Sequence, residues 1–102
     1  VALPGATEKS NWNAAVELTR AGSRLIRMKT DVELGWLLLR SAKTVAQLTK
    51  PLTLIASAAK LDIVESLEEV VVDALTEWLN SGHASFFDDI HETWRLRRDY
   101  GS

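Results

Sequence analysis

The chain has 102 residues, 46% of them hydrophobic, and a formal net charge of −2. This length and balance indicate a single domain and exclude a wholly disordered chain, and the absence of cysteine excludes disulfides, thiolate metal ligands and cysteine nucleophiles. No uncharged run approaches the ~20 apolar residues of a membrane-spanning helix, so we expect a soluble protein without integral membrane association, with an intracellular location favoured.

The charges divide unevenly between the two halves of the chain. Residues 1–60 contain nine basic and four acidic residues, a balance of +5, whereas residues 61–102 contain three basic and ten acidic residues, a balance of −7. This asymmetry predicts either that the halves face each other or that each half meets a different partner.

Residues 1–9 contain Pro4 and Gly5 without apolar periodicity, which predicts a flexible N-terminal arm on a single helical domain spanning residues 1–102. A helix is predicted to begin near Ser10, whose hydroxyl can cap its first amides. Gly22 weakens this helix but does not end it.

A stripe of apolar or small residues recurs at alternating spacings of four and three between residues 14 and 46. Its members are Ala14, Leu18, Ala21, Leu25, Met28, Val32, Gly35, Leu39, Ala42 and Ala46. This is the a/d pattern of a helix buried along one seam. Half of the members are alanine or glycine, so another backbone can approach closely.

Residues 30–33 have the S/T-x-x-E form of a capping box, with Thr30 as the cap and Glu33 three positions later. This form predicts a break at Lys29–Thr30. The unbroken stripe instead favours one continuous helix of about 60 Å, which cannot fit a domain with a radius of gyration near ~13 Å. We favour the break, and the continuous helix, with subunits meeting at the seam, stays open as the alternative.

The remaining elements are also predicted to be helices. A second helix over residues 31–49 is apolar around most of its circumference and ends before Pro51. A short helix follows over residues 51–59, with a kink or restart near Asp62, and then a helix over residues 63–80 that ends at a left-handed Gly82. A last helix follows with Ser85 as its cap. The fold class is therefore all-α, a helical bundle or elongated helical hairpin of four to five helices.

These patterns favour a non-enzymatic helical assembly module that binds itself or another helical protein. The mechanism would be burial of the small-residue seam, oriented by pairing between the basic and acidic halves. Trp12 and Trp94 are included in the predicted interface because their helices have few other apolar residues and tryptophan is enriched in interfaces. The predicted interface residues are Trp12, Leu18, Ala21, Leu25, Met28, Val32, Gly35, Leu39 and Trp94.

The alternative is a structural protein that binds nucleic acid. Arg20, Arg24 and Arg27 stand at spacings of four and three, which places them in one row on a helix that can follow a phosphate backbone. The same row can instead be a solvated face that pairs with the acidic helix over residues 63–80, or a face that contacts an anionic membrane surface.

Catalytic, cofactor and metal sites are not expected. His83 and His91 lie near Asp88 and Glu92, but a metal site in a helical bundle also needs carboxylates that point inward from facing helices. No serine lies in a nucleophile elbow, and adjacent carboxylates on a helix point apart.

Overall fold

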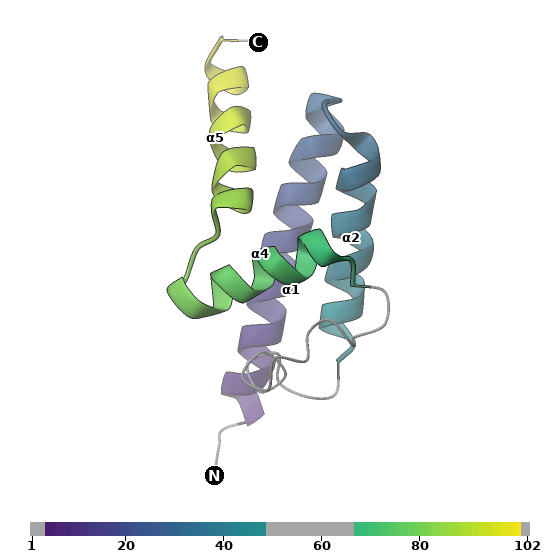
Figure 1. The fold of residues 1–102 in the computed structure, drawn as a ribbon, viewed down its shortest axis with the longest axis vertical. Helices are drawn as coiled ribbons and strands as arrows, with labels where there is room; N and C mark the ends of the chain where they lie inside the picture. The colour runs from purple at the N-terminus through teal and green to yellow at the C-terminus, as the bar shows by residue number, and fades with distance from the viewer. Residues whose placement is uncertain (1–3, 49–66, 101–102) are drawn as a thin grey trace.

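The computed structural model describes residues 4–48 and 67–100, which form four helices and no strand (Figure 1). The helices are α1 (Pro4–Met28), α2 (Val32–Ala46), α4 (Glu69–Ser81) and α5 (Ser85–Tyr100). α1 and α2 form an antiparallel hairpin, α5 packs beside the second half of α1, and α4 crosses in front of the hairpin. The all-α prediction is confirmed.

α1 begins six residues before the predicted start at Ser10. Its first residue is Pro4, so residues 4–9, which the sequence predicts as part of an N-terminal arm, belong to the helix. Proline suits the first helical position because its fixed φ is close to the helical value and its missing N–H has no intrahelical partner there. The expectation of irregular chain at Pro4-Gly5 was therefore wrong.

The break between the first two helices is confirmed, and the continuous helix is excluded. Lys29 adopts a left-handed φ of 58°, and α2 begins at Val32. The capping residue is Asp31 rather than the predicted Thr30, because the Asp31 Oδ1 accepts a hydrogen bond from the Leu34 amide at 3.0 Å. The resulting fold has a radius of gyration of 14.0 Å, close to the ~13 Å of a compact chain of this length.

The hairpin closes on two glycines that face each other. A Cβ atom placed on Gly22 would lie 2.7 Å from the carbonyl oxygen of Gly35, and one on Gly35 would lie 2.6 Å from Ile26 Cγ1. Only glycine permits so close an approach of two helix backbones. The small residues of the stripe therefore bring together two helices of one chain.

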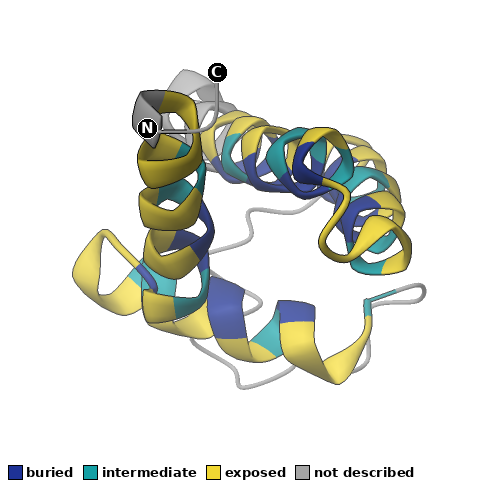
Figure 2. Ribbon diagram, turned by 90° about the horizontal axis from the view of Figure 1, so that it is seen from above, coloured by how far each residue is buried: buried dark blue, intermediate teal, exposed yellow. Residues whose placement is uncertain are grey.

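All four helices contribute a fully buried side chain to one core. These side chains are Leu18 of α1, Leu38 of α2, Leu75 of α4 and Phe87 of α5. Buried residues lie on the inner sides of the helices and exposed residues on the outer sides (Figure 2). The core therefore joins both halves of the chain.

The ends of three helices differ from the predicted bounds. α2 ends at Ala46, three residues early. α4 begins at Glu69, because residues 67 and 68 are not helical, and residues 63–66 of the predicted helix lie outside the described residues. The predicted left-handed end at Gly82 is confirmed by its φ of 84°. Ser85 is the first residue of α5 and not its cap, because the Asp88 amide donates to the carbonyl of Ala84.

The predicted helix over residues 51–59 and the restart near Asp62 lie outside the described residues. Among the helices of the described ranges, none is long and apolar enough to cross a membrane.

Candidate interaction surfaces

The predicted interface residues separate into a buried and an exposed group. Five are buried by the chain's own helices: Leu18, Ala21, Leu25, Met28 and Gly35. Trp12 and Val32 are exposed, and Leu39 and Trp94 are half-buried. The stripe therefore supplies the core of the single chain, and only its edge reaches the surface.

The exposed apolar side chains gather on one side of the hairpin, which we call the outer hairpin face. It consists of Trp12, Val16 and Thr19 of α1 and Val32, Trp36, Leu39, Lys43 and Ala46 of α2. Six large hydrophobic residues are exposed within the described ranges, and four of them lie here: Trp12 (65% exposed), Trp36 (55%), Val16 (40%) and Val32 (40%). A contiguous group of exposed hydrophobic side chains is typical of an interaction surface, whereas single exposed hydrophobic residues scattered over a surface are common and indicate no function.

A groove of about 400 Å³ runs along this face between α1 and α2. Its small residues are Ala15, Thr19, Ala42 and Ala46, and its larger apolar residues are Trp12, Val16 and Leu39. Lys43 is the one charged residue that lines it. The groove is thus an apolar channel with a floor of small side chains.

Sequence reasoning missed Val16 and Trp36 as surface residues. Trp36 belongs to the row Val32, Trp36, Leu39, Lys43 and Ala46, with spacings of four and three. This row shares Val32, Leu39 and Ala46 with the stripe, and its lysine indicates that this side of the stripe faces water. Charge within an apolar row is therefore the signal that could have separated the outer hairpin face from the core.

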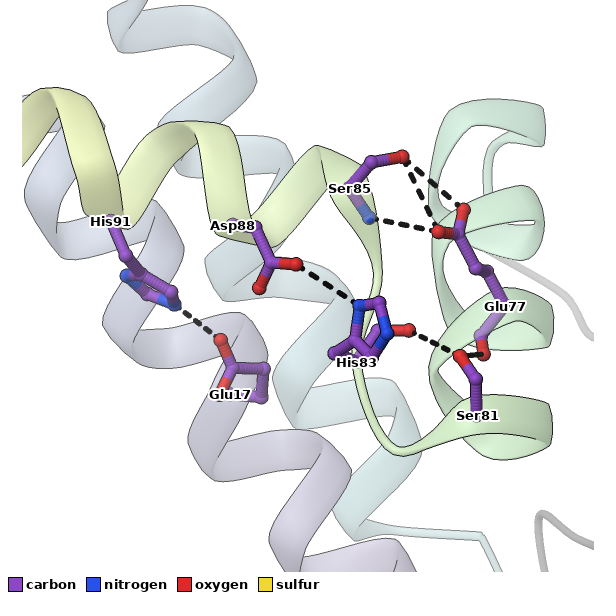
Figure 3. A network of polar contacts seen from close by, with 7 residues as sticks. All are labelled: Glu17, Glu77, Ser81, His83, Ser85, Asp88 and His91. Carbon is purple, nitrogen blue, oxygen red and sulfur yellow. Dashed lines mark hydrogen bonds and ion pairs between the residues drawn. The ribbon is translucent and has the colours of Figure 1, made fainter.

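A polar cluster joins α1 to α5. His91 Nδ1 accepts a hydrogen bond from Arg24 at 2.7 Å, and His91 Nε2 donates to the carboxylate of Glu17, toward which the ring points (Figure 3). Because a guanidinium has no acceptor, both contacts fit the neutral tautomer protonated at Nε2. The Arg24 guanidinium also lies 5.5 Å from the centre of the Trp94 ring.

The three arginines of the predicted row differ in their surroundings, because one of them contacts His91 of α5. Arg24 turns toward α5, and burial together with the nearby Arg20 lowers its pKa, with Arg98 acting in the same direction and Glu17 opposing. Arg20 and Arg27 are exposed. The structure thus adds an arginine of α5, Arg98, to the surroundings of the predicted row.

Between α1 and α5 lies a second groove of about 470 Å³, which we call the α1–α5 groove. Its lining residues are Arg24, Asp88, His91, Glu92, Trp94, Arg95 and Arg98. Arg95 binds Glu92 at 2.6 Å, and this bond holds the pKa of the Glu92 carboxyl below its usual value. Arg97 of α5 donates to the carbonyl of Met28 at 2.8 Å, which satisfies a carbonyl at the end of α1.

The corner between α4 and α5 has a structural role. The Glu77 carboxylate accepts hydrogen bonds from the Ser85 amide at 2.9 Å and from the Ser85 hydroxyl at 3.3 Å (Figure 3). A side chain of α4 therefore provides the hydrogen-bond acceptor for the first backbone amide of α5. His83 Nδ1 contacts Asp88 Oδ2 at 3.1 Å in the same corner.

The expected pairing between the arginine row and the acidic helix is not seen within the described part of the chain. The contacts there between an acidic side chain and a histidine or arginine join His83 to Asp88, His91 to Glu17 and Arg95 to Glu92. None of these pairs connects an acid of α4 to an arginine of α1. The two halves are held together mainly by the apolar core and the Glu17–His91–Arg24 cluster.

The described ranges contain no group of three or more histidine, aspartate or glutamate side chains placed to hold a metal ion. Comparisons with protein-family models, with curated proteins and with solved structures found no match.

Proposed function

We propose that this protein is a non-enzymatic helical assembly module that associates with a second copy of itself through the outer hairpin face. The observation that supports this proposal is the presence of four exposed large hydrophobic residues on the outer hairpin face. Trp12 and Val16 line its groove, and Val32 and Trp36 lie in the same row of α2 as the groove residues Leu39 and Lys43. Tryptophan is enriched at the energetic centres of interfaces, where a large ring is fully removed from water.

The available apolar area is sufficient for weak to moderate association. Trp12 and Trp36 are each more than half exposed. Burying the exposed part of each ring, on the order of 150 Å², would contribute about 3–4 kcal/mol per ring at about 25 cal/mol per Å². Two rings on each of two copies would contribute about 12–16 kcal/mol, compared with the ~4–15 kcal/mol that association costs.

A second copy is the favoured occupant because the face contains both a groove and protruding rings. Two copies related by a twofold axis present the same patch to each other, so a ring of one copy can enter the groove of the other. The floor formed by Ala15, Ala42 and Ala46 leaves room for such a ring. Lys43 is the one charged residue that lines the groove, and charged residues are depleted at interface centres.

Light scattering after size-exclusion chromatography, over a range of concentrations, tests this proposal. We expect a dimer that dissociates on dilution, and a monomer for the double variant Trp12→Gln with Trp36→Gln. The matched control is Val70→Gln with Leu96→Gln, which removes two exposed hydrophobic side chains from other surfaces and should leave the dimer intact.

Because all four side chains are exposed, the variants should keep the helical circular dichroism of the wild type. A wild-type protein that is monomeric at every concentration would refute the proposal. Equal loss of association in the control variant would also refute it, because the contact would then not depend on the outer hairpin face.

A further inference from the structure

Positive charge from two distant parts of the sequence converges at the α1–α5 groove. Arg24 and Arg98 line it, and Arg20 lies near enough to Arg24 to affect its ionisation. Arg27 follows Arg24 at the next turn of α1. The row from Arg20 to Arg27 spans about 10 Å along the helix at 1.5 Å per residue, a length that can contact more than one phosphate of an extended strand.

Each acidic side chain near this surface contacts another side chain of the protein. Glu17 accepts from His91, Glu92 binds Arg95, and Asp88, which also lines the groove, contacts His83. Arg20, Arg27 and Arg98 form no ion pair with another residue of the described ranges. Arg20 and Arg98 both disfavour the charged form of Arg24, a repulsion that a bound anion would relieve.

Arg24 is held in a fixed orientation at the centre of the surface. One of its nitrogens donates to His91 Nδ1 at 2.7 Å, and the guanidinium lies over the Trp94 ring. A guanidinium carries five N–H donors in a planar fork, so donors remain for an oxyanion. The half-buried Trp94 ring is an aromatic side chain of the kind on which an unpaired base stacks.

We propose that the α1–α5 groove binds the backbone of a single-stranded nucleic acid, with Arg20, Arg24 and Arg98 contacting phosphates and Trp94 supporting a base. This surface is distinct from the outer hairpin face and does not depend on self-association. A single strand fits better than a duplex because its bases are free to stack in a groove. An anionic membrane fits less well, because membrane-binding surfaces place large apolar side chains beside their cations, and Trp12, Val16, Val32 and Trp36 lie on the other face.

Fluorescence anisotropy of a labelled oligodeoxythymidylate, titrated with the full chain, tests this proposal. With three phosphate contacts, the logarithm of the binding constant should fall with the logarithm of salt concentration at a slope of about −2, so raising salt from ~50 to ~200 mM should weaken binding roughly 20-fold. The double variant Arg20→Ala with Arg98→Ala should reduce that slope to about −0.7, since one contact remains.

The matched control compares two single variants. Arg98→Ala and Arg40→Ala each remove one exposed arginine and the same charge, but Arg40 lies on α2, away from the α1–α5 groove. We expect Arg98→Ala to weaken binding several-fold at low salt and Arg40→Ala to change it less than twofold. Arg24 is left intact because its contacts with His91 and Trp94 also support the packing of α5.

Three results would overturn the proposal. The first is no binding of the oligonucleotide at low salt. The second is an equal effect of Arg40→Ala and Arg98→Ala, which would indicate attraction by net charge alone. The third is tighter binding to a DNA duplex, or to vesicles of phosphatidylcholine and phosphatidylserine, than to the single strand. Unchanged circular dichroism of each variant ensures that a loss of binding reports on the surface and not on unfolding.

Discussion

Replacing Gly22 by alanine tests the contact that closes the α1–α2 hairpin. The added Cβ atom would lie 2.7 Å from the carbonyl oxygen of Gly35, whereas ordinary contacts begin at 3.4 Å. It would also lie 3.1 Å from Leu38 Cβ and 3.2 Å from Leu39 Cγ. Because the nearest atom belongs to the backbone of a packed helix, α2 must move away from α1 as a unit.

Two opposing effects determine the size of the change. In a helix without neighbours, alanine would be more stable than glycine by about 1 kcal/mol. Overpacking typically costs ~1–3 kcal/mol, and the backbone contact at Gly22 places this substitution in the upper half of that range. The net result should be a loss of about 1–2 kcal/mol, which corresponds to a decrease in melting temperature of roughly 4–16 °C for a domain of this size.

Thermal unfolding followed by far-ultraviolet circular dichroism provides the measurement. Asn13→Ala is the matched control, because Asn13 is an exposed position of the same helix and gains helix propensity without a clash. Its melting temperature should stay equal or rise slightly. If Gly22→Ala also raised the melting temperature, the two helices would not meet at Gly22 and Gly35, and the described packing of the hairpin would be wrong.

Four further substitutions test other parts of the fold by urea denaturation and hydrogen exchange. Asp31→Ala should reduce the free energy of unfolding by about 1 kcal/mol, whereas Thr30→Ala should change it by only a few tenths, because Asp31 caps α2. Phe87→Ala should cost about 3–5 kcal/mol, since the ring is 1% exposed, and a loss below ~1 kcal/mol would contradict its place in the core. Glu77→Ala removes the acceptor of the Ser85 amide, so that amide should exchange faster with solvent, and an unchanged exchange rate would argue against the contact.

The sequence by itself determined the features that depend on near neighbours in the chain. Helical periodicity predicted an all-α fold, and the polar residues around Thr30 predicted the break after α1. Gly82 predicted the end of α4, because a left-handed residue is most easily supplied by glycine. Helix propensity is compatible with more than one starting residue for a helix. The first residues predicted for α1 and α4 were therefore wrong.

The small residues of the stripe also predicted that two helix backbones come close together. They did not indicate which two helices these are. The stripe between residues 14 and 46 is compatible with a contact between subunits and with a contact inside one chain. Once the chain reverses at Lys29, Gly22 faces Gly35, and the contact is closed within the hairpin. The surface that remains exposed therefore includes Val16 and Trp36, which were not among the interface residues predicted from the sequence.

Only the tertiary structure decided how α5 meets α1. His91 lies 74 residues from Glu17 and 67 residues from Arg24, and no local pattern connects them. Their contact turns Arg24 toward Trp94 and brings Arg98 near the predicted arginine row. Helix formation follows from hydrogen bonds and side chains within a few turns, whereas the choice of facing helices follows from burying the apolar faces of all four helices in one core. Both candidate interaction surfaces result from that second choice.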